Sequence, residues 1–116
     1  MTSERPPLSP NDFHLLLVLA KGESYGYALL KAMEEESSGT VRPDIGSLYR
    51  ALARLVAGGL VEDAGERPDD PVAPGKPRRY YRISAAGRAA LAADAARLRQ
   101  ALALADARLA TERGRS

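Results

Sequence analysis

Apolar residues repeat at helical spacing near the N-terminus. An apolar side chain recurs every three or four positions, at Phe13, Leu16, Leu17 and Ala20. The intervening residues Leu15, Val18 and Leu19 are apolar too, so this helix is expected to be buried on more than one side, against its own core and a partner subunit. Ser9 followed by Pro10 predicts its start, and Lys21-Gly22 predicts its end.

Two more helical segments follow. Ser24 is expected to cap a helix over residues 25–36, and Ser37-Ser38-Gly39 to end it. Its inner stripe is Tyr25, Ala28, Leu29, Ala32 and Met33. A third helix is predicted from near Asp44 to Gly58-Gly59. Because residues 37–43 form a short linker, the two helices should make a helix-turn-helix.

The periodicity changes after Gly59. Residues 60–64 and 78–83 are predicted to be strands, separated by an unpaired loop at 65–77 that contains four prolines. Ser84 is expected to cap a long helix to about Thr111. The predicted fold class is therefore mainly α with a small β-hairpin. It comprises an N-terminal tail (1–8), a winged helix-turn-helix domain (9–83), a C-terminal helix (84–111) and a fraying tail (112–116).

The third helix is amphipathic. Its apolar side carries Ile45, Leu48, Leu52, Leu55 and Val56, with Tyr49 at the edge. Ser47, Arg50 and Arg54 fall on the opposite side, beside the small Ala51. A helix that reads a DNA groove needs one face packed in the core and another that carries hydrogen-bond donors. The candidate DNA contacts are therefore Ser47, Tyr49, Arg50 and Arg54. The alternative is an ordinary helix whose arginine face is solvated.

Charge is unevenly distributed although the formal net charge is only +2. Residues 76–88 carry five basic residues and no acid, whereas residues 62–70 carry five acids and one arginine. Alternation along residues 78–83 directs Tyr81 and Ile83 to the core, and Arg78, Tyr80 and Arg82 to the other face. Lys76, Arg78 and Arg79 are candidate phosphate ligands, and Tyr80 is expected either to donate to phosphate or to pack on neighbours. The acids imply that the tip itself avoids the DNA backbone; the alternative is a solvated strand beside a solvated loop.

The last helix carries a heptad seam: Leu91, Ala95, Leu98, Leu102, Ala105 and Leu109. A helix this long exceeds what so small a domain can cover, so the seam is expected to form a homodimer; the alternative is that it folds back on its own domain. An effector site is expected between the first helix and the partner's last helix, near Phe13, Leu17 and Leu98. Dimer packing could instead consume this apolar surplus.

The composition argues against other classes of protein. Hydrophobic residues make up 45% and charged residues 28%, which is typical of a globular domain. The chain has no cysteine, and its one histidine, His14, lies in an apolar helix without metal-ligand spacing around it. We therefore expect no enzyme activity, no metal and no cofactor. The polar, proline-rich start lacks the apolar core of a signal peptide, so we expect a soluble cytoplasmic protein with no membrane partner.

Four motifs together resemble the PadR family of transcriptional regulators. They are SYGY at residues 24–27, GSLYRAL at 46–52, LVAGGLV at 55–61 and RYYRISAAGR at 79–88. The resemblance covers about Leu15 to Leu91 and implies a dimeric winged-helix repressor that binds an inverted repeat in double-stranded DNA and is released by a small molecule. It is similar to the compact branch with a single C-terminal helix. Some members of that branch hold flat aromatic ligands with a tryptophan, which this chain lacks.

A protein-interaction module is the alternative function, because winged helices also serve as scaffolds. The outward face of the third helix separates the two, since interaction modules tend to lack cations like those of Arg50 and Arg54.

Overall fold

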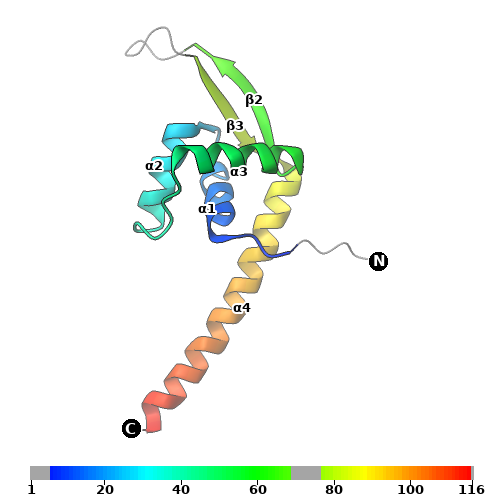
Figure 1. Ribbon diagram of the computed structural model, residues 1–116. Helices are drawn as coiled ribbons and strands as arrows, with labels where there is room; N and C mark the ends of the chain where they lie inside the picture. The colour runs from blue at the N-terminus through cyan, green and yellow to red at the C-terminus, as the bar shows by residue number, and fades with distance from the viewer. Residues whose placement is uncertain (1–5, 69–76, 116) are drawn as a thin grey trace.

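The computed structural model describes residues 6–68 and 77–115 (Figure 1). The helices are α1 (Pro10–Leu19), α2 (Gly26–Glu36), α3 (Ile45–Ala57) and α4 (Ala85–Arg115), and the strands are β1 (Ser24–Tyr25), β2 (Val61–Arg67) and β3 (Arg78–Ile83). Four helices with a small antiparallel sheet confirm the predicted winged helix-turn-helix with its long last helix.

Within residues 6–68 and 77–115, the sheet has three strands in the order β1-β3-β2, not the two predicted. Ser24 and Tyr25 pair with Tyr81 and Tyr80 of β3, so the predicted role of Ser24 as a helix cap is wrong. Tyr25 occupies the N-cap position of α2 and makes no side-chain cap bond, because these two residues complete the sheet before the helix begins.

The first helix starts as predicted and lies at the centre of the core. Ser9 accepts a hydrogen bond from the backbone N–H of Asp12 at 3.1 Å. Four apolar residues of α1 are buried: Leu15, Leu16, Val18 and Leu19. They pack toward α2, β3 and the start of α4, so the helix is covered on several sides within its own chain.

A tight turn sets α2 against α3. Ser37 is buried, and its hydroxyl accepts the backbone N–H of Val41 at 2.9 Å. Gly39, at φ +81°, allows the chain to reverse. The apolar side of α3 then enters the core through Leu48, Leu52 and Leu55.

The hairpin is longer than predicted. Strand β2 continues to Arg67, so residues 65–67, predicted to lie in an unpaired loop, pair with β3. The register shifts by one residue at a bulge between Asp63 and Gly65, where Gly65 has φ +90°, and pairing continues beyond it. Tyr81 and Ile83 are buried, which confirms the predicted core face of β3.

The last helix leaves the domain and projects away from it (Figure 1). It continues to Arg115, beyond the predicted end at Thr111. Gly87 lies so close to the strand region that an added Cβ would collide with the backbone carbonyl of Leu60 and approach Ile83 Cγ1 to 2.7 Å. This contact fixes the first turn of α4 against the base of the hairpin.

Candidate nucleic-acid interface

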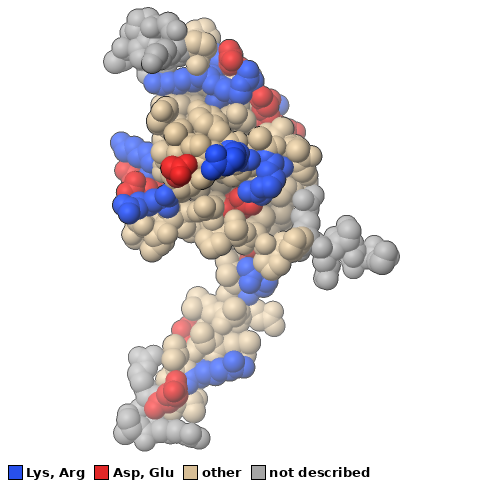
Figure 2. Space-filling view, in the orientation of Figure 1, with Lys and Arg blue, Asp and Glu red and all other residues tan. Residues whose placement is uncertain are grey.

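Hydrogen bonds in the first turn of α3 fix the start of the helix and orient side chains on its outward face. The carboxylate of Asp44 accepts the backbone N–H of Ser47 at 2.7 Å, and this bond keeps the pKa of Asp44 below its usual value. The guanidinium of Arg50 donates to the Ser47 hydroxyl at 3.1 Å and is exposed. Tyr49 is also exposed and packs its ring against Gly26, where a side chain would collide with it. Figure 2 shows Lys and Arg atoms gathered over α3 and along the hairpin.

Arg54 occupies a different setting from Arg50. Its guanidinium donates to both carboxylate oxygens of Asp12, at 2.8 and 3.0 Å. The Asp12 side chain is 9% exposed and that of Arg54 is 62% exposed, so the pair closes over the start of α1. These bonds raise the pKa of Arg54. The pair ties the last turn of α3 to the first turn of α1.

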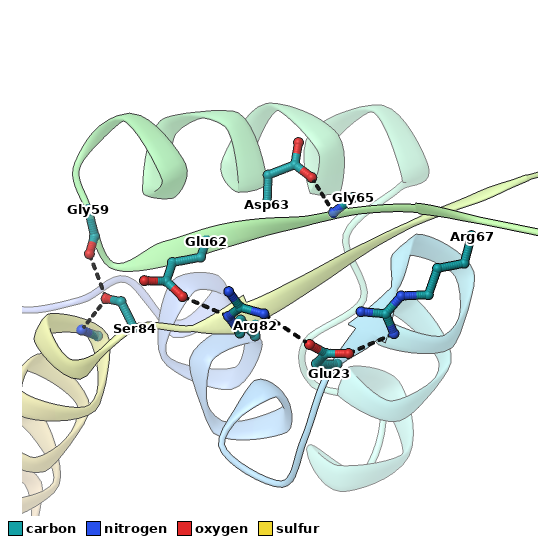
Figure 3. A network of polar contacts seen from close by, with 9 residues as sticks. Glu23, Gly59, Glu62, Asp63, Gly65, Arg67, Arg82 and Ser84 are labelled. Carbon is teal, nitrogen blue, oxygen red and sulfur yellow. Dashed lines mark hydrogen bonds and ion pairs between the residues drawn. The ribbon is translucent and has the colours of Figure 1, made fainter.

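Arg79 lies on the same face of the hairpin as the buried Tyr81, because alternate residues of a strand share a face. Its Nη1 donates to both oxygens of Asp63, at 2.9 and 2.8 Å, and its Nη2 to Glu66 at 3.0 Å. Asp63 is drawn on the α3 side of the hairpin in Figure 3. The backbone N–H of Gly65, followed by the guanidinium of Arg79, lowers the pKa of Asp63.

The opposite face of the hairpin carries a second network (Figure 3). Glu23 accepts from Arg67 at 2.7 Å and from Arg82 at 3.3 Å, and Arg82 also donates to Glu62 at 2.7 Å. The bond from Arg67 is the main cause of the lowered pKa of Glu23.

Aromatic rings stabilise the same side. The guanidinium of Arg78 lies 4.3 Å from the ring centre of Tyr25, and that of Arg67 lies 4.5 Å from that of Tyr80. Tyr25 and Tyr80 meet edge to face at 5.5 Å. Tyr80 therefore packs on its neighbours, one of the two roles considered for it.

The structure thus divides the predicted DNA contacts among several places. Ser47, Tyr49 and Arg50 lie together on α3, whereas Arg78 and Arg79 point to opposite faces of the hairpin. Lys76 lies outside the described residues. Sequence reasoning missed Asp12 and Glu23 as partners of arginines, since neither partner is near in sequence. The Glu62–Arg82 pair could have been found from hairpin register, because the two residues are directly opposite.

The seam of α4 is only partly covered in one chain. Leu91 packs against the core and Ala95 is half-buried, but every described side chain beyond Ala95 is exposed. The exposed seam positions include Leu98, Leu102 and Leu109. The predicted homodimer therefore stays a prediction with an apolar surface to support it.

The predicted effector residues are not among those that line the cleft found in the described part of the chain. Phe13 is half-buried, and Leu17 and Leu98 are 36% and 42% exposed. A cleft of about 470 Å³ lies elsewhere, between the N-terminal segment and the end of α3, and Asp12 and Arg54 line it. The predicted site between subunits remains a prediction.

A helix-turn-helix followed by a β-hairpin defines the winged-helix class. Residues 15–93 match the family described as the transcriptional regulator PadR-like family. This match covers more than half of the 116 residues, so the chain belongs to the PadR-like family of transcriptional regulators. No curated protein matches the chain. In the described ranges, no helix has the length and apolar character needed to cross a lipid bilayer.

Solved structures share the fold. A PadR family regulator from Clostridium difficile R20291 superposes with a TM-score of 0.71 at 21% identity, over 87% of this chain and 99% of that one. A transcriptional regulator from Thermoplasma acidophilum gives 0.66 at 27% identity, over 85% and 89% of the two chains. Bacillus subtilis PadR in complex with operator DNA gives 0.60 at 20% identity, over 69% of this chain and 43% of that one.

Proposed function

We propose that this PadR-like regulator is a homodimeric repressor that binds an inverted repeat in double-stranded DNA. The observation that carries the proposal is the exposed donor face of α3, presented beside a hairpin that carries arginines. The structure of Bacillus subtilis PadR, which shares the fold, is a complex with operator DNA and so supports DNA as the partner of this chain.

In this proposal α3 enters the major groove. Arg50 is the leading candidate for a base contact, because it is exposed and its bond to the Ser47 hydroxyl aims it along the outward face. Ser47 and Tyr49 support it from the same turn of helix. Arg54 is engaged by Asp12, which favours a role in positioning α3 over a role in reading bases.

The hairpin contributes phosphate contacts. Arg79 is the leading candidate, because it lies on the α3 side. Arg78 and Tyr80 are retained from the sequence as secondary candidates, because they lie on the opposite face and pack on neighbouring side chains. Lys76 is retained from the sequence as a candidate. Phosphate contacts fix the position of the protein on the duplex without reading its sequence.

A two-fold symmetric dimer follows if the exposed seam of α4 packs against the same seam of a second subunit. The two α3 helices would then reach successive major grooves, about 34 Å apart on one face of the duplex. The two half-sites should accordingly be separated by about one helical turn. A small-molecule effector held between α1 and the partner's α4 remains part of the proposal.

The test is selection from a random duplex pool, followed by fluorescence anisotropy on the selected duplex and on a scrambled version. We expect the selected sequence to be an inverted repeat. Arg50→Ala should lower affinity for the selected duplex, by about 1–3 kcal/mol for a base-reading contact. Arg99→Ala removes the same charge from α4, outside the winged domain, and should change the preference little. Selection that yields no shared sequence would favour the interaction-module alternative.

A further inference from the structure

The guanidinium of Arg79 is engaged at both ends by acids of the neighbouring strand. Asp63 takes two hydrogen bonds, at 2.9 and 2.8 Å, and Glu66 takes one at 3.0 Å. The three side chains remain 41–54% exposed, so a ligand from solvent can reach them.

The strand geometry holds Asp63 in this arrangement. Its Oδ1 also accepts the backbone N–H of Gly65 at 2.8 Å, at the bulge of β2. Glu66 lies directly across from Arg79 in the ladder. The cluster therefore results from the backbone of the hairpin, and its position on the α3 side brings it to the face that would meet DNA.

Carboxylate and phosphate oxygens compete for the same donors. A guanidinium presents a planar fork of N–H groups that both anions accept in the same way. A phosphate that binds Arg79 must therefore displace carboxylates already seated on it, and it also approaches two negative charges.

We propose that Asp63 and Glu66 form an electrostatic brake on DNA binding, in which their carboxylates compete with phosphate for Arg79. This inference rests on the proposed DNA binding. It assigns Asp63 and Glu66 a role in that binding, which a purely basic surface would not include. Because phosphate contacts carry no sequence information, the brake lowers affinity for every duplex by a similar factor. Base contacts from α3 then decide whether binding occurs at a given salt concentration.

The opposite face of the hairpin provides a matched control. Glu62 and Arg82 form a pair of the same charges at 2.7 Å, directly across the same two strands. This pair lies on the side of Glu23, away from α3. Glu62→Gln and Asp63→Asn change the net charge equally but release arginines on different faces.

The experiment measures anisotropy of wild type, Asp63→Asn and Glu62→Gln on the selected and scrambled duplexes. Asn retains an oxygen for the N–H of Gly65, so the bulge should be kept; Glu66→Gln is a second variant that leaves the bulge bond untouched. Asp63→Asn should raise affinity for both duplexes by about twofold to fivefold per subunit, the range for releasing an exposed ion pair. Glu66→Gln should raise affinity for both duplexes by a smaller factor. Glu62→Gln should raise affinity for both duplexes less than Asp63→Asn does.

The gain must act through Arg79. In an Arg79→Ala background, Asp63→Asn should lose most of its effect, since a double-mutant cycle isolates the coupling between the two residues. An equal gain from Glu62→Gln would overturn the proposal in favour of a general charge effect, and weaker binding by Asp63→Asn would overturn it in favour of Asp63 orienting Arg79. A wild-type protein that binds neither duplex would instead contradict the proposed function itself.

Discussion

The ion pair of Asp12 and Arg54 makes it possible to test whether Arg54 positions α3 or contacts DNA. Breaking a fully buried pair on one side costs about 3–5 kcal/mol, and an exposed pair is worth less than about 1 kcal/mol. Since the carboxylate is 9% exposed and the guanidinium 62%, we expect Arg54→Ala to lower the free energy of unfolding by about 1–2 kcal/mol. Asp12→Ala should cost less, because water can solvate the guanidinium that remains.

The effect on DNA binding distinguishes the two roles. If Arg54 positions α3, Asp12→Ala and Arg54→Ala should both weaken binding to the selected duplex, and the double variant should be no worse than Arg54→Ala. Urea unfolding and anisotropy on the same samples measure both effects. Arg50→Ala is the control, since its partner Ser47 is a neighbour on the surface of α3 and its loss should spare stability. Stronger DNA binding by Asp12→Ala would refute this reasoning, because it would mean that Asp12 withholds Arg54 from DNA.

Three further outcomes are expected. Leu102→Asp on the seam should shift sedimentation toward monomer at micromolar concentration. Leu104 is also apolar and exposed but lies off the seam, so Leu104→Asp should not shift it. A stable wild-type monomer would exclude the dimer. Gly87→Ala should lower stability by about 1–3 kcal/mol through its clash with the backbone carbonyl of Leu60, offset in part by the higher helix propensity of alanine. Gly114→Ala, in open space, should not destabilise, and equal thermal melts of the two variants would contradict the close contact at Gly87. The folded-state pKa of Asp44 is lowered, so the stability that its carboxylate contributes is present above its unfolded pKa and is lost as pH falls through the folded value. Asn at this position caps the helix without titrating, so the melting temperature of Asp44→Asn should fall less than that of wild type between pH 7 and pH 3. An equal fall in both proteins would contradict the capping role of Asp44.

Local patterns predicted most elements of the fold. The Ser9 cap, the apolar side of α3 and the alternation of β3 each depend on residues a few positions apart, so periodicity and capping chemistry were sufficient. The missed strand at Ser24 and Tyr25 is different, because two residues carry no periodicity and pair only with a strand more than fifty positions away. Residues 65–67 were misassigned because the nearby prolines suggested a loop, whereas the bulge at Gly65 allows pairing to continue.

The candidate site was predicted by residue type but not by partner. Arg50 lies on the exposed face of α3 as the helical wheel indicated, yet the same wheel grouped Arg54 with it. Their different settings come from Asp12, which is 42 positions from Arg54 in the sequence and pairs with it only in the folded chain. Likewise, Glu62, Asp63 and Glu66 are ion-pair partners of Arg82 and Arg79, and the strand register brings them together.

A salt titration of DNA binding tests the central claim most directly. Wild type and Arg50→Ala would be titrated on the selected and scrambled duplexes. If each subunit of a dimer neutralises about four phosphates, the plot of log K against log salt should have a slope near −7 for wild type, from about 0.9 per phosphate. Wild type should prefer the selected duplex at every salt concentration, and Arg50→Ala should reduce that preference by about 1–3 kcal/mol. Equal binding of both duplexes by wild type, unchanged by Arg50→Ala, would contradict sequence-specific DNA binding through α3.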